Sequence, residues 1–201
     1  MSHVFISYSH EDDDFASQLE LELESREIDA WTDHDLEAGD EWKSSIDDAI
    51  KQCFALLAVM SPDAKNSEYV TYEWSYALGV GVKVIPIIHR QTSLHPKLND
   101  LQYIDFSGDF DSAFKSLLRR VKQLELNYLL DSLHDSNYRI REKAVRRLGE
   151  RKVKRAVPDL IHMLDHDRSR KIVRPAAAQT LELIGSDEAL EAVKTWRGKQ
   201  A

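Results

Sequence analysis

Hydrophobic positions in the first 125 residues alternate between short continuous runs and a spacing of three to four residues. The continuous runs are rich in β-branched and aromatic residues, which favours buried strands. They cover residues 3–8, 28–32, 54–60, 82–88 and 103–106. The helical spacing predicts a helix that begins near residue 11 and further helices over residues 42–52, 67–78 and 110–124. Residues 90–101 are polar and interrupted by Pro96, so the pattern assigns no helix there.

This alternation predicts an α/β fold. Strands separated by helices are joined by right-handed crossovers, which produces a parallel sheet with helices on both faces. Residues 54–60 are apolar throughout, as a central strand of such a sheet requires. Residues 103–106 are shorter and more polar, so we place them at an edge. The expected architecture is a flavodoxin-like sheet of five parallel strands.

The remaining residues, 126–201, are helical and repetitive. Helices are expected over residues 126–134, 139–150, 156–164, 171–184 and 188–196. The set Arg141, Ala144 and Leu148 recurs 33 positions later as Arg174, Ala177 and Leu181. Such helix pairs stack on one another, because no pair can bury its apolar face alone. The pattern resembles short HEAT-like repeats and predicts two domains, residues 1–125 and residues 126–201.

Fewer than three full repeats are present, whereas about three are needed for an independent stack. We therefore expect one open end of the tail to pack on the first domain or on another chain. The same reasoning makes the repeats a candidate surface for a protein partner.

The net charge changes sign at the same boundary, between residues 125 and 126. Residues 1–125 carry 11 Lys and Arg against 24 Asp and Glu, a net −13, whereas residues 126–201 carry 16 against 11, a net +5. Nine basic residues fall within 139–155. Few aromatic residues are interleaved with them and no nucleic-acid motif is present, so a solvated repeat face or a contact with the acidic domain is favoured over nucleic-acid binding.

Several classes of protein are disfavoured by the sequence. The apolar stretches are too short to span a bilayer, and the N-terminus lacks the pattern of a signal peptide. Cys53 is the single cysteine, which excludes an intrachain disulfide and fits a cytoplasmic protein, with Cys53 as a small core residue. No metal site is expected among the eight histidines.

Ligands of open α/β sheets bind at the carboxyl ends of the strands. In this sequence those ends carry hydroxyl groups at Ser7, Tyr8 and Ser9, a carboxylate at Asp33, and the loop that follows Met60. The helix that begins near Ser67 is expected to face the same edge.

These segments resemble TIR domains. Residues 4–9, followed by an acidic turn, are similar to the first TIR motif, and the polar loop 33–40 before Trp42 and Ile46 is similar to the BB loop and its helix. Residues 67–73, Ser-Glu-Tyr-Val-Thr-Tyr-Glu, resemble the segment that carries the catalytic glutamate of bacterial members. The resemblance covers residues 1–125.

The resemblance implies that Glu73 is a catalytic residue for cleavage of NAD+, with NAD+ as substrate and no cofactor. From its spacing alone, Glu73 would be a solvated helix carboxylate. The family commonly has tryptophan four residues upstream, where this chain has Tyr69. Candidate substrate-binding residues are Tyr8, Ser9, Asp33, Trp42, Tyr69 and Tyr72; for each, an ordinary turn, cap or packing role is the alternative.

NAD+ cleavage suits a single carboxylate, because nicotinamide leaves as a neutral ring and needs no proton donor. What remains is to stabilise the oxocarbenium-like ribose, which an anionic side chain does electrostatically. Family members of this kind act in bacterial signalling or antiviral defence and self-associate. The alternative is a non-catalytic TIR adaptor that only binds proteins. A third interpretation is a sensor whose basic tail binds nucleic acid.

Overall fold

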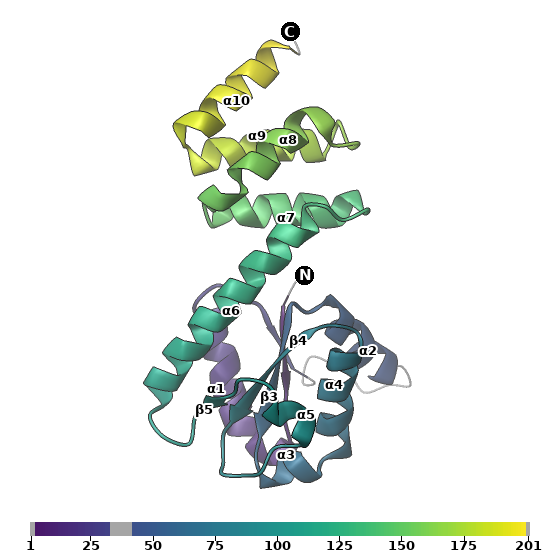
Figure 1. Ribbon diagram of the computed structural model, residues 1–201, viewed down its shortest axis with the longest axis vertical. Helices are drawn as coiled ribbons and strands as arrows, with labels where there is room; N and C mark the ends of the chain where they lie inside the picture. The colour runs from purple at the N-terminus through teal and green to yellow at the C-terminus, as the bar shows by residue number, and fades with distance from the viewer. Residues whose placement is uncertain (1–2, 33–41, 200–201) are drawn as a thin grey trace. The chain divides into compact units, whose positions relative to one another are not determined.

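The computed structural model describes residues 3–32 and 42–199 (Figure 1). Its internal contacts separate into two compact units, Met1–Glu125 and Leu126–Ala201. None of the described helices combines the length and apolar character needed to cross a bilayer.

Within the described part of the first unit, five parallel strands form a sheet in the order β2-β1-β3-β4-β5. The strands are β1 (Val4–Ser7), β2 (Ala30–Trp31), β3 (Ala55–Met60), β4 (Lys83–Ile88) and β5 (Ile104–Asp105). This is the flavodoxin-like order, in which the winding reverses between β1 and β3. The predicted fold and the edge position of the last strand are confirmed.

Helices cover both faces of this sheet. They are α1 (Asp13–Glu24), α2 (Trp42–Gln52), α3 (Pro62–Asn66), α4 (Glu68–Gly79), α5 (Pro96–Asn99) and α6 (Phe110–Ser132). Figure 1 shows α1 on one face and α2 and α4 on the other. Alternate residues of β3, namely Leu56, Ala58 and Met60, share a buried core with Ile50 of α2 and Trp74 of α4, as the two-residue period of a strand dictates.

Serine caps position the two helices that follow β3. The hydroxyl of Ser61 accepts a hydrogen bond from the amide of Ala64 at 3.0 Å, and Pro62 occupies the first turn of α3. The hydroxyl of Ser67 accepts from the amide of Val70 at 3.3 Å. These caps start α4 at a defined residue and thereby set the face on which Glu73 lies.

The structure adds to or differs from the sequence assignments at three places. The short α5 forms where no helix was assigned, because Pro96 stands in its first turn and the ring nitrogen of His95 accepts from the amide of Lys97 at 3.2 Å. The serine cap likewise produces the short α3 in the segment after Met60, where a loop was expected. The two helices predicted over 110–124 and 126–134 are one helix, α6, since no glycine or proline interrupts them.

The second unit contains the end of α6, then α7 (Tyr138–Glu150), α8 (Val157–His166), α9 (Val173–Ile184) and α10 (Asp187–Gly198). Their apolar faces form a continuous core that includes Leu148, Leu160 and Leu181. Asn137 caps α7, Ser186 caps α10, and Gly185 ends α9 in the left-handed conformation with φ at +68°. The predicted helical repeats are confirmed.

An ion pair joins the two repeats at the positions that recur in the sequence. Arg141 of α7 donates to both carboxylate oxygens of Asp167, at 2.7 and 3.0 Å, and to the carbonyl oxygen of Asp135 at 2.8 Å. Arg174, 33 residues later, donates to the carbonyl oxygen of Asp167 at 2.8 Å. Each of the two arginines therefore donates a hydrogen bond to the loop that precedes its own helix, α7 for Arg141 and α9 for Arg174.

Candidate functional site

Glu73 lies on α4 and faces the carboxyl end of β1. The residue is 7% exposed, and its Oε2 accepts a hydrogen bond from the hydroxyl of Ser7, the last residue of β1, at 2.5 Å. The alternative that Glu73 is a solvated helix carboxylate is therefore wrong. A buried carboxylate at a strand end is the arrangement expected of a site in an open α/β sheet.

A pocket of about 280 Å³ opens beside this carboxylate. It is lined by Lys43, Ile46, Glu68, Tyr69, Tyr72 and Glu73. Three of the predicted site residues, Glu73, Tyr69 and Tyr72, thus share one cavity between α2 and α4. Tyr69 is 64% exposed, so its ring offers an open aromatic face at the pocket.

Tyr72 is fixed by its neighbours. Its hydroxyl donates to Oδ1 of Asp47 at 2.5 Å, and its ring stacks on that of Tyr76 with centroids 5.7 Å apart. The hydrogen bond to Asp47, with burial as a lesser cause, raises the pKa of Tyr72 to about 12. The phenol therefore remains a protonated donor at neutral pH, and α2 and α4 stay linked.

The other predicted substrate residues lie elsewhere or outside the described residues. The hydroxyl of Tyr8 donates to Oδ1 of Asp13 at 3.3 Å, and the hydroxyl of Ser9 donates to Oε2 of Glu11. The bond from Ser9 also lowers the pKa of Glu11. Neither residue lines the pocket beside Glu73. Asp33 lies outside the described residues; Trp42 begins α2, and its side chain is not among those described.

Lys43, Ile46 and Glu68 line the pocket and were not predicted as site residues. Lys43 and Ile46 are three residues apart, which places them on the same face of α2. The helical periodicity of residues 42–52 could have identified this face, but nothing in the sequence showed that it would meet α4 beside Glu73.

A second polar cluster lies at the same edge of the sheet. Asp12 is 2% exposed; it accepts from the hydroxyl of Ser61 at 2.5 Å and from Nη2 of Arg90, which also contacts Asp63 at 2.7 Å. Burial lowers the pKa of the neighbouring His89. Asp12 belongs to the acidic turn after β1, but unlike a solvated turn residue it is buried, and these donors compensate its burial.

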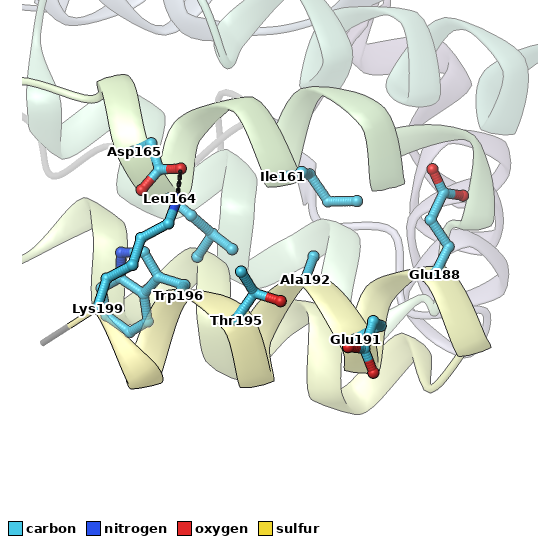
Figure 2. Close-up of a pocket in the computed structure, with 9 residues that line it drawn as sticks. All are labelled: Ile161, Leu164, Asp165, Glu188, Glu191, Ala192, Thr195, Trp196 and Lys199. Atoms are coloured by element: carbon cyan, nitrogen blue, oxygen red, sulfur yellow. Dashed lines mark hydrogen bonds and ion pairs between the residues drawn. The ribbon is translucent and has the colours of Figure 1, made fainter. Parts of the chain in front are cut away.

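Two other concavities contain none of the predicted residues. A depression of about 880 Å³ extends from Gln102 along α6 to Leu124. A groove of about 340 Å³ lies between α8 and α10 (Figure 2), with Ile161, Leu164 and Trp196 among its apolar lining. Nζ of Lys199 pairs with Asp165 at 2.9 Å at one end of the groove.

No three His, Cys, Asp or Glu side chains of the described residues gather in a way that could hold a metal ion.

Comparison with known proteins gives relatives for both units. Residues 126–200 match the family model for HEAT repeats. An uncharacterized protein of Sinorhizobium fredii, y4lF, is 33% identical over 141 residues. The match covers 61% of this chain and 43% of that protein, so this chain spans less than half the length of its relative.

The first unit has a solved structural relative. The crystal structure of the TIR domain of the Toll-related receptor TRR-2 from Hydra magnipapillata superposes with a TM-score of 0.56 and 26% sequence identity. The match covers 61% of this chain and 99% of that domain. The family model for the TIR domain matches residues 4–118, which is more than half of the sequence. This chain therefore belongs to the TIR domain family, with HEAT repeats following the TIR domain.

Proposed function

We propose that this protein is an NAD+ nucleosidase that cleaves the bond between nicotinamide and ribose, releasing nicotinamide and ADP-ribose or a cyclic variant. The observation that carries the proposal is the position of Glu73. Its carboxylate is buried, is hydrogen-bonded to Ser7, and lines a pocket that also presents the exposed ring of Tyr69.

The charge of Glu73 suits the reaction. As the glycosidic bond breaks, positive charge develops on the ribose, and a fixed carboxylate beside it stabilises the transition state more than the ground state. The bond from Ser7 restricts the rotamer of Glu73, so the carboxylate does not have to reorganise during the reaction. Tyr69 lies one helical turn before Glu73 and is placed to stack on the nicotinamide or the adenine ring.

The pocket is small for a whole dinucleotide. Its volume of about 280 Å³ lies just below the usual range for small-molecule sites, ~300–1,000 Å³. The pocket fits the nicotinamide and its ribose, whereas the adenosine end needs further walls. TIR domains self-associate or bind other proteins, and a neighbouring copy would supply such walls. We therefore expect turnover to rise with protein concentration more steeply than in proportion.

Nicotinamide release from NAD+ tests the proposal. The full chain should release nicotinamide at high protein concentration, and Glu73→Gln should reduce kcat by at least ~100-fold, the scale typical of lost electrostatic stabilisation. Glu68→Gln is the matched control, because Glu68 lines the same pocket on the same helix. Equal losses in both variants, or turnover by Glu73→Gln at the wild-type rate, would contradict the assignment of Glu73.

A scaffold function is the second candidate. Tyr69 is an aromatic residue with 64% of its surface exposed on α4, and aromatic residues are enriched in protein interfaces. A non-catalytic adaptor would show no turnover at any concentration and would still associate. Sedimentation velocity on the wild type and on Tyr69→Ala, run beside the turnover assay, separates the two candidates.

A further inference from the structure

The carboxylates that line the pocket would repel the diphosphate of a dinucleotide unless a cationic residue compensates for them. Glu68 and Glu73 contribute two carboxylates to the lining, whereas the diphosphate of NAD+ carries two negative charges. Without a nearby cation, the carboxylates of Glu68 and Glu73 would repel the diphosphate.

Lys43 is the single cationic residue in the described lining of the pocket. Its Nζ lies 4.9 Å from the centroid of the Tyr72 ring, one residue before Glu73, in a cation–π contact. The tyrosine beneath it is held by Asp47. The ammonium group is therefore directed over a fixed ring at the pocket, although the side chain is exposed.

Among residues 3–32 and 42–199, no carboxylate forms an ion pair with Lys43. Lys51, two turns further along α2, makes a similar cation–π contact with Tyr76 at 5.8 Å, but its Nζ also pairs with Asp48 at 3.6 Å. Lys51 does not line the pocket. Within the described part of the chain, Lys51 therefore has a carboxylate partner and Lys43 has none.

We propose that Lys43 binds the diphosphate of the dinucleotide and thereby selects NAD+ over substrates with the same scissile bond but no diphosphate. This inference rests on the proposed function, because it takes NAD+ as the ligand. Lys43 would act in binding rather than in bond cleavage, since the diphosphate carries the same charge before and after nicotinamide leaves. Its loss should therefore raise KM and leave kcat close to that of the wild type.

A pair of substrates and a pair of lysines test this. Nicotinamide release is measured from NAD+ and from nicotinamide riboside, which has the same bond and no phosphate. Lys43→Met keeps the aliphatic stem over Tyr72 and should raise KM for NAD+ about tenfold, equivalent to ~1.4 kcal/mol, while kcat/KM for nicotinamide riboside stays within twofold. Lys51→Met is the matched control and should change neither KM for NAD+ nor kcat/KM for nicotinamide riboside. Lys43→Arg keeps the positive charge and should retain most of the preference for NAD+ over nicotinamide riboside.

Equilibrium binding of ADP-ribose to the full chain separates failure of this inference from failure of the proposed function. A wild type that hydrolyses NAD+ while Lys43→Met keeps its KM overturns the role of Lys43 only. A wild type that binds ADP-ribose about tenfold more tightly than Lys43→Met, without any turnover, supports Lys43 and overturns the nucleosidase. Absence of both turnover and binding overturns both, and equal weakening by Lys51→Met would show a general charge effect and overturn the assignment to Lys43.

Discussion

The hydroxyl of Ser7 and the carboxylate of Glu73 are 66 residues apart in the sequence and are joined by a 2.5 Å hydrogen bond. Ser7→Ala removes a donor to a carboxylate, a loss on the order of 1.5–3 kcal/mol. We expect kcat for nicotinamide release to fall about ten- to a hundredfold while KM for NAD+ changes little, because the bond positions Glu73 rather than the substrate. Ser7→Thr keeps the hydroxyl and should restore most of kcat; a rise in KM for Ser7→Ala with kcat unchanged would contradict this role.

Arg141 should dominate the stability of the helical unit. It forms a buried, two-pronged ion pair with Asp167, and removing one partner of such a pair costs about 3–5 kcal/mol. Hydrogen exchange of the α7 and α9 amides in the full chain should report a loss of this size in Arg141→Leu. Arg146→Leu is the control, since Arg146 forms only an exposed pair with Glu142 on the same helix; an equal effect would show that burial is not the cause.

The same ion pair predicts sensitivity to acid. Burial opposes the charge of Asp167, but hydrogen bonds from Arg141 and from the amide of Ser169 outweigh it and hold the pKa below its ordinary value. A carboxyl with a lowered pKa stabilises the fold above its unfolded pKa, about 3.9, and loses this contribution as the pH falls through the folded value. Protection of α9, corrected for intrinsic exchange, should therefore decline below about pH 4. Asp167→Asn should remove this pH dependence, and an unchanged decline would assign it to other groups.

Gly149 marks a close contact between α7 and α9. A β-carbon at this position would lie 2.8 Å from Oγ1 of Thr180, which donates to the carbonyl oxygen of Val145 at 3.0 Å. Gly149→Ala should lower the free energy of unfolding by about 1–3 kcal/mol, since overpacking outweighs the ~1 kcal/mol gained in helix propensity. Gly198→Ala meets no atom within 4 Å and should be neutral or stabilising. Chemical denaturation compares the two, and equal effects would exclude a steric cause.

Cys53 should be inert in the folded protein. Burial raises the pKa of its thiol to about 12, and its Sγ donates to the carbonyl oxygen of Ile50 at 3.1 Å. Reaction requires the thiolate, so a disulfide reagent at pH 8 should label Cys53 only after denaturant is added. Rapid labelling of the native chain would instead show that the core around Cys53 opens, and the labelling rate would measure how often it opens.

The sequence predicted the sheet because each strand has its own apolar run, and short runs between helices leave few topologies. It also predicted that Tyr69, Tyr72 and Glu73 share a site, because their spacing on one helix is local information. It did not predict Lys43 as a site residue or the burial of Asp12. Both depend on partners far away in the sequence, Tyr72 for Lys43 and Arg90 for Asp12, and such pairings follow from packing rather than from local pattern.

The polar contacts that Arg141 and Arg174 make with Asp167 recur with the 33-residue period of the repeats. Further repeats could therefore be added to the helical unit with the same contacts. A duplicated block of residues 139–171, inserted after residue 171, would give each Asp167 an Arg141 from its own block. The new junction would repeat the carbonyl contact that Arg174 now makes. Insertion of whole blocks would therefore leave each buried Arg141 and Asp167 with its partner. We expect a tandem duplication of this segment to preserve the polar contacts at the junctions between blocks.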